Sequence, residues 1–183
     1  MIPVGYMAKK IFKKSDWPKS DQIEDIYSIS NCMSNDFTDY INFWKHNGYW
    51  MFDSPEIIQQ LAKEYKIDLK DTKIFFYEVY EFQYSDGASP WKLFQPEKSF
   101  PTNIQIPQNK VLEGYDIASF STGNTPEHSY LSCNGMAATI SVNKHCLLRT
   151  FEEAKSLLEK GEFKNCEPGP SRIFAVYSIS DGE

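Results

Sequence analysis

Lys73-Ile-Phe-Phe-Tyr-Glu-Val-Tyr-Glu-Phe-Gln-Tyr84 carries the strongest strand signal in the chain. It is rich in aromatic and β-branched residues, which suit the pleated surface of a β-sheet. Its first half is apolar on both faces, as in a strand that is covered from both sides. Glu81 and Gln83 bring one face towards water in the second half. The stretch therefore predicts the central strand of a sheet.

Further strands are expected on both sides of this stretch. Ser85-Asp-Gly-Ala-Ser-Pro90 contains a strong turn dipeptide, so residues 91–94 should return as the partner strand of a hairpin. Other strand patterns cover residues 2–12, 110–121 and 172–180, with an extended stretch at 23–30 and a short edge strand at 104–106. The sequence therefore predicts five or six strands.

Three helices are expected around this sheet. Apolar residues at helical spacing over Phe37–Trp44 precede Asn47-Gly48, which suits a helix end. Ser54-Pro-Glu56 is typical of a helix start, and that helix should run to about residue 66. Thr150 and Glu153 form a capping box before a third helix, with Gly161 beyond its end. Without regular alternation of strands and helices, the sequence predicts one α+β domain over residues 1–183, with a mostly antiparallel sheet.

Composition excludes several classes of function. The 183 residues carry a net charge of -6, whereas binding to nucleic acid needs clustered Lys and Arg. No apolar run approaches the roughly 20 residues of a membrane span, and the first residues lack a secretion signal, so we expect a soluble, cytoplasmic protein. The four cysteines show no paired short spacing, which predicts reduced thiols rather than a disulfide framework or a zinc ribbon. No cofactor motif is present.

The irregular section 121–149 holds the densest set of reactive side chains. Cys133 could act as the nucleophile of a small hydrolase or transferase, with His128 or His145 as the base and Glu127 or Asp116 as orienter. Alternatively, the section could bind a small ligand. Free cysteine is more often a small buried hydrophobe, so a structural role is favoured. A zinc site built from these residues and Cys146 is not predicted, because His145 and Cys146 are adjacent and would point to opposite faces.

Three residues are candidates for a ligand pocket. Glu78 lies within an apolar strand, where lost hydration would raise its pKa and suit a general acid. A Lys, an Arg or a tyrosine hydroxyl could equally pair with it. Asp116, after Tyr115, could be a pocket acid or a hydrogen bonder at a strand end.

The leading functional hypothesis is stoichiometric binding to a basic protein, as an inhibitor or immunity-type partner. Trp and Tyr dominate binding hot spots, and acidic side chains steer a cationic surface towards them. The expected binding patch consists of Tyr49, Trp50, Phe52, Asp53 and Glu56. The rings of this patch could equally be core. A structural or assembly subunit is a third possibility, which would form a stable homo-oligomer.

Overall fold

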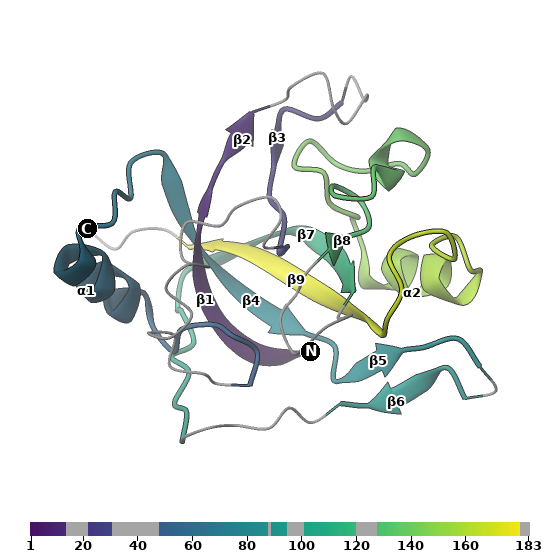
Figure 1. The fold of residues 1–183 in the computed structure, drawn as a ribbon, viewed down its shortest axis with the longest axis horizontal. Helices are drawn as coiled ribbons and strands as arrows, with labels where there is room; N and C mark the ends of the chain where they lie inside the picture. Colours follow the sequence, from purple (N-terminus) through teal and green to yellow (C-terminus); the bar gives the residue numbers. More distant parts are fainter. Residues whose placement is uncertain (14–21, 31–47, 88, 95–100, 120–127, 180–183) are drawn as a thin grey trace.

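The computed structural model describes residues 1–13, 22–30, 48–87, 89–94, 101–119 and 128–179 (Figure 1). The strands are β1 (Ile2–Lys10), β2 (Phe12–Lys13), β3 (Asp25–Ile26), β4 (Thr72–Val79), β5 (Phe82–Tyr84), β6 (Trp91–Leu93), β7 (Lys110–Ser119), β8 (His128–Ser129) and β9 (Ser171–Ile179). The helices are α1 (Pro55–Tyr65), α2 (Phe151–Glu159) and a 3-10 turn at Met136–Ala138. The mixed α/β class with a mostly antiparallel sheet is confirmed.

Seven strands form one antiparallel sheet around β4 and β9. β4 lies between β1 and β9, which confirms a central strand for the first part of the stretch 73–84, whereas residues 82–84 form the separate strand β5. On its other side β9 pairs with β7, and β7 pairs with β8. The hairpin of β5 and β6 joins the start of β9 through the pairing of Tyr84 with Ser171. β2 and β3 form a separate small sheet.

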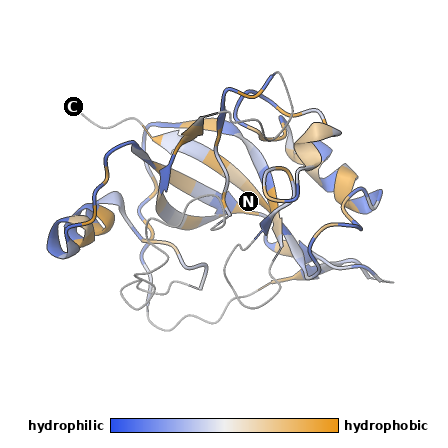
Figure 2. Ribbon diagram, turned by 45° about the horizontal axis from the view of Figure 1, so that its top comes forward, coloured by the Kyte–Doolittle hydropathy of each residue, from blue (hydrophilic) through white to orange (hydrophobic). Residues whose placement is uncertain are grey.

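The sheet separates two hydrophobic cores at β7 and β9. On β9, Phe174 and Val176 belong to the first core and Ile173 to the second. On β7, Ala118 and Ile117 divide in the same way, because successive side chains of a strand point to opposite faces. α1 contributes to the first core and α2 to the second. In Figure 2 hydrophobic and hydrophilic colours alternate along the central strands, and hydrophobic colour also lies on the helices.

The helix ends follow the sequence signals with one difference. Thr150 accepts a hydrogen bond from the Glu153 N–H at the start of α2, as expected for a capping box. Ser54 occupies the N-cap position of α1, but its side chain makes no capping hydrogen bond. α1 ends at Lys66 in the left-handed conformation, without a glycine. Among the described residues, neither α-helix is long and apolar enough to cross a membrane.

Two of the expected elements do not appear among the described strands and helices. Residues 104–106 do not form an edge strand, because Asp53 holds this backbone: its carbonyl oxygen accepts from the Gln105 N–H at 2.9 Å and its carboxylate from the Asn103 N–H at 2.8 Å. The helix expected over Phe37–Trp44 lies outside the described residues. Two α-helices are therefore described where three were expected.

Candidate functional site

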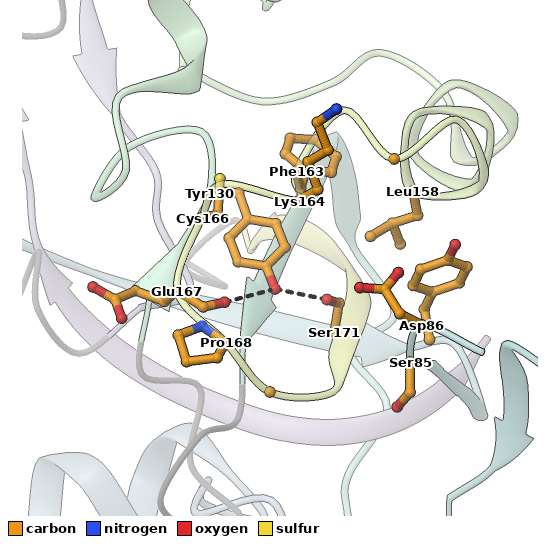
Figure 3. A pocket seen from close by; sticks show the side chains of 13 residues that line it. Ser85, Asp86, Tyr130, Leu158, Phe163, Lys164, Cys166, Glu167, Pro168 and Ser171 are labelled. Atoms are coloured by element: carbon orange, nitrogen blue, oxygen red, sulfur yellow. Dashed lines mark hydrogen bonds between the residues drawn. The ribbon is translucent and has the colours of Figure 1, made fainter.

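A cavity of about 210 Å³ opens between β5, the end of α2 and the loop that leads into β9. We call it the Tyr130 cavity (Figure 3). Its lining combines rings, hydroxyl groups and charged side chains, namely Tyr84, Ser85, Asp86, Tyr130, Leu158, Gly161, Phe163, Lys164, Cys166, Glu167, Pro168, Gly169 and Ser171. The cavity is smaller than the roughly 300 Å³ at which pockets for small-molecule ligands begin. It therefore has room for one side chain or a small ion.

Three distant segments of the chain build this cavity. The pairing of Tyr84 with Ser171 brings the β5–β6 turn beside the start of β9. Tyr130 follows β8, where its N–H donates to the Ile117 carbonyl at 2.9 Å. Phe163 belongs to the turns after α2 and its ring lies 5.1 Å from that of Tyr130. The walls therefore rest on the sheet and on the second core.

Two buried hydroxyl groups meet inside the cavity. The Tyr130 Oη and Ser171 Oγ atoms are 2.7 Å apart, and Tyr130 Oη also donates to the Glu167 carbonyl at 3.4 Å. Only 3% of Tyr130 and 5% of Ser171 is exposed. Either hydroxyl can be the donor in the Tyr130–Ser171 pair. In both arrangements at least one lone pair of Ser171 Oγ remains available to a donor in the cavity.

Burial and nearby carboxylates raise the pKa values of the two cavity tyrosines. Burial raises the pKa of the Tyr130 hydroxyl, the bond with Ser171 opposes that rise, and the charges of Asp86 and Glu167 add to it. Burial also raises the pKa of Tyr84, again with a contribution from Asp86. Both tyrosines therefore stay neutral, and both interact electrostatically with the carboxylate of Asp86.

Asp86 is the charged group directed into the cavity. In Figure 3 its carboxylate faces the Tyr130–Ser171 pair, whereas the Glu167 carboxylate and the Lys164 ammonium group point away from it. Within the described part of the chain, the Asp86 side chain has no hydrogen-bond or ion-pair partner. The Asp86 carboxylate and the Ser171 hydroxyl therefore offer hydrogen-bond acceptors to a ligand that supplies the donors.

None of the described cysteines has the properties of the nucleophile expected in section 121–149. Cys133 is disulfide-bonded, so its sulfur is not a thiolate in this form, and the expectation of reduced cysteines is wrong for this residue. Cys146 and Cys166 are free. Burial raises the pKa of Cys146 to about 12 and also raises that of Cys166, which lowers the reactivity of both. A disulfide is typical of oxidising compartments, which counts against the expected cytoplasmic location.

The two histidines of that expected triad have separate environments. His128 lies in β8, paired with Ser119, and is partly exposed. His145 is buried: its Nδ1 pairs with Asp25 and its Nε2 lies 3.4 Å from Glu113 Oε2. The ring stacks on Tyr27 at 4.0 Å between centroids. Because both nitrogens of His145 face carboxylates, neither is open to serve as the base for Cys133.

The three residues expected to line a ligand pocket do not line the Tyr130 cavity. Glu78 pairs with Lys110 at 2.5 Å and accepts from the Tyr177 hydroxyl at 2.8 Å, which is the paired alternative foreseen from the sequence. Tyr115 forms a backbone bridge with Leu148.

Asp116 is the centre of a fully buried network. Its carboxylate accepts from Ser129 Oγ at 2.6 Å, Ile117 N at 2.9 Å, Ile29 N at 3.0 Å and Ser28 Oγ at 3.3 Å. Burial raises the pKa of Asp116 to about 6 against the opposing effect of these hydrogen bonds. With four donors from its own chain, this carboxylate is occupied structurally and does not face a ligand.

The expected binding patch is mostly core. Tyr49 and Phe52 are buried, Phe52 in a bridge with Tyr6, so neither ring can anchor a partner. Trp50 packs against the same core and Asp53 holds the segment 103–105. Glu56, in the first turn of α1, is exposed. The rings expected to form an exposed binding surface therefore belong to the first core or pack against it, as Ile104 also does.

Comparisons with known proteins add no family assignment: no protein-family model, curated protein or solved structure matches this chain. Within the described ranges, no group of three or more His, Cys, Asp or Glu side chains is arranged to hold a metal ion. The function of the chain is therefore inferred from the geometry of the Tyr130 cavity.

The sequence interpretation missed the residues that define this cavity. Asp86 lies in the expected hairpin turn, and Ser171 directly precedes the strand expected over residues 172–180. Tyr130 lies in the irregular section but was not singled out. No local sequence signal marks these residues, because they meet only through the pairing of Tyr84 with Ser171, which places the two loops side by side.

Proposed function

We propose that this chain is a binding protein that associates stoichiometrically with a basic protein, in the manner of an inhibitor or immunity-type partner. The observation that carries the proposal is the Tyr130 cavity, a recess that presents an unpaired carboxylate and hydroxyl lone pairs, and whose free thiol, Cys166, has a pKa raised by burial. Such a recess suits recognition of a side chain rather than a chemical step. The net charge of -6 supports attraction of a cationic partner.

The cysteine enzyme, the alternative from the sequence, receives no support from the described thiols. Cys133 is in a disulfide, and the raised pKa values of Cys146 and Cys166 leave little thiolate at neutral pH. His145 is held between two carboxylates. A cysteine nucleophile with a histidine base would need both groups in other states.

Native mass spectrometry after gentle capture from the lysate of the host tests the proposal. The tag follows Glu183, because β1 begins at Ile2 and a tag there would border the sheet. We expect a one-to-one complex with a basic protein, which dissociates as ionic strength rises from about 0.05 to 0.5 M and the charges are screened. A bare monomer, a homo-oligomer or a complex that is insensitive to salt would overturn the proposal, and an unrelated acidic protein with the same tag is the control.

A further inference from the structure

The Tyr130 cavity presents acceptors and ring faces to whatever enters it. The acceptors are the carboxylate of Asp86 and an open lone pair of Ser171 Oγ. The rings are those of Tyr84, Tyr130 and Phe163. A matching occupant has several donors, no acceptors and a positive charge, and it tolerates contact with aromatic faces.

Size and shape narrow the choice among cations. A cavity of about 210 Å³ excludes a nucleotide or a drug-sized cofactor and accommodates one extended side chain. An ammonium group is a compact and strongly hydrated point charge. A guanidinium group is planar, carries five donors in a fixed fork, is more weakly hydrated and stacks on rings. The separated acceptors and the aromatic walls fit the guanidinium group better.

We propose that the Tyr130 cavity receives the guanidinium group of one arginine side chain, which bonds to Asp86 and Ser171 and lies against the surrounding rings. That the arginine belongs to a protein rests on the function proposed above. The recognition of the guanidinium group itself does not depend on it. Free arginine-like molecules are therefore suitable probes.

The test is an NMR titration of the full, ¹⁵N-labelled chain with N-acetyl-arginine methylamide. Its matched probe is N-acetyl-citrulline methylamide, which keeps the shape of the side chain and removes the charge. We expect amide shifts at Ser85, Asp86 and Tyr130 and in the 163–171 loop, with a dissociation constant on the order of 1 mM. The citrulline probe should cause none of these shifts at the same concentrations.

Asp86→Asn is the decisive variant, because Asp86 is exposed in a turn and its loss leaves the fold intact. Loss of one partly solvated ion pair should weaken the arginine probe about fivefold. Asp68→Asn is the matched control: Asp68 is exposed, lies before β4 at the opposite end of the sheet, and accepts from the Lys70 N–H, which Asn also permits. This variant should bind the probe like the wild type.

Three results would overturn the inference: no shifts around the cavity, equal shifts with the citrulline probe, or unchanged affinity in Asp86→Asn. They are separable from failure of the proposed function. If the chain captures a basic protein equally well with Asp86→Asn, the binding function stands and the cavity is not its contact. If the arginine probe binds as expected but the captured chain is a bare monomer, the guanidinium site stands and the proposed function is overturned.

Discussion

Asp116 and Asp86 are two aspartates in opposite situations. Asp116 is fully buried and accepts four hydrogen bonds from its own chain. Asp86 is exposed at the mouth of a cavity, and the described residues give its carboxylate no donor. A carboxylate whose acceptors are all occupied has nothing left for a ligand, whereas an unpaired one costs little stability and keeps its acceptors open. The comparison separates a residue that holds the fold from one that is available for binding.

The strongest test of this comparison is replacement of each aspartate by alanine. Asp116→Ala leaves the donors of Ser129, Ile117 and Ile29 buried without an acceptor, which should lower the free energy of unfolding by about 3 to 5 kcal/mol. Asp86→Ala should leave it unchanged within error. Urea denaturation at pH 7 measures both. Similar losses in the two variants would contradict the division between them.

The pH dependence of stability sharpens the same comparison. The pKa of Asp116 is raised to about 6 in the folded state, above the value of about 3.9 in an unfolded chain. Between these values the folded state binds more protons, so the free energy of unfolding falls as pH rises. This contribution is complete below about pH 4 and is lost above about pH 6, and it amounts to about 2 to 3 kcal/mol.

The matched variant for this measurement is Asp116→Asn, which does not titrate. The unfolding free energy of the wild type minus that of the variant should decrease between pH 4 and pH 7. A difference that is flat or rises with pH would show that the hydrogen bonds outweigh burial and hold the folded pKa at or below its ordinary value. Asp86→Asn should follow the wild type across this range.

The contrast also explains how far the sequence could be interpreted. β4, β7 and β9 were predicted because alternation and ring content are local properties of a strand. The cavity was not predicted, because Tyr84 and Ser171 lie 87 positions apart and meet only through strand pairing, and no local pattern encodes that meeting. The ring types at 49–52 suit a core and an interface equally. Tyr49 and Phe52 are buried in the first core, against which the distant Ile104 also packs.

His145 provides an intermediate case between the two aspartates. Its ring is buried between the carboxylates of Asp25 and Glu113, which come from β3 and β7. His145→Ala leaves these two like charges without the group between them and should lower the free energy of unfolding by about 1 to 2 kcal/mol. The control is His128→Ala, which removes a partly exposed histidine from β8. Thermal or urea unfolding compares the pair, and an equal effect would show that the carboxylates are relaxed by solvent.

The smallest expected effect concerns the hydroxyl pair of the cavity. Tyr130→Phe keeps the ring against Phe163 but removes the bonds to Ser171 and Glu167, which should cost about 1 kcal/mol. Tyr115→Phe is the matched control, because no hydrogen bond of the Tyr115 hydroxyl occurs within the described ranges. Without Tyr130 Oη, Ser171 Oγ loses its hydrogen-bond partner and becomes free to rotate, so the arginine probe should bind more weakly although Asp86 is intact. Unchanged affinity in Tyr130→Phe, together with weaker binding in Asp86→Asn, would assign recognition to the carboxylate alone and leave the buried hydroxyls with a structural role like that of Asp116.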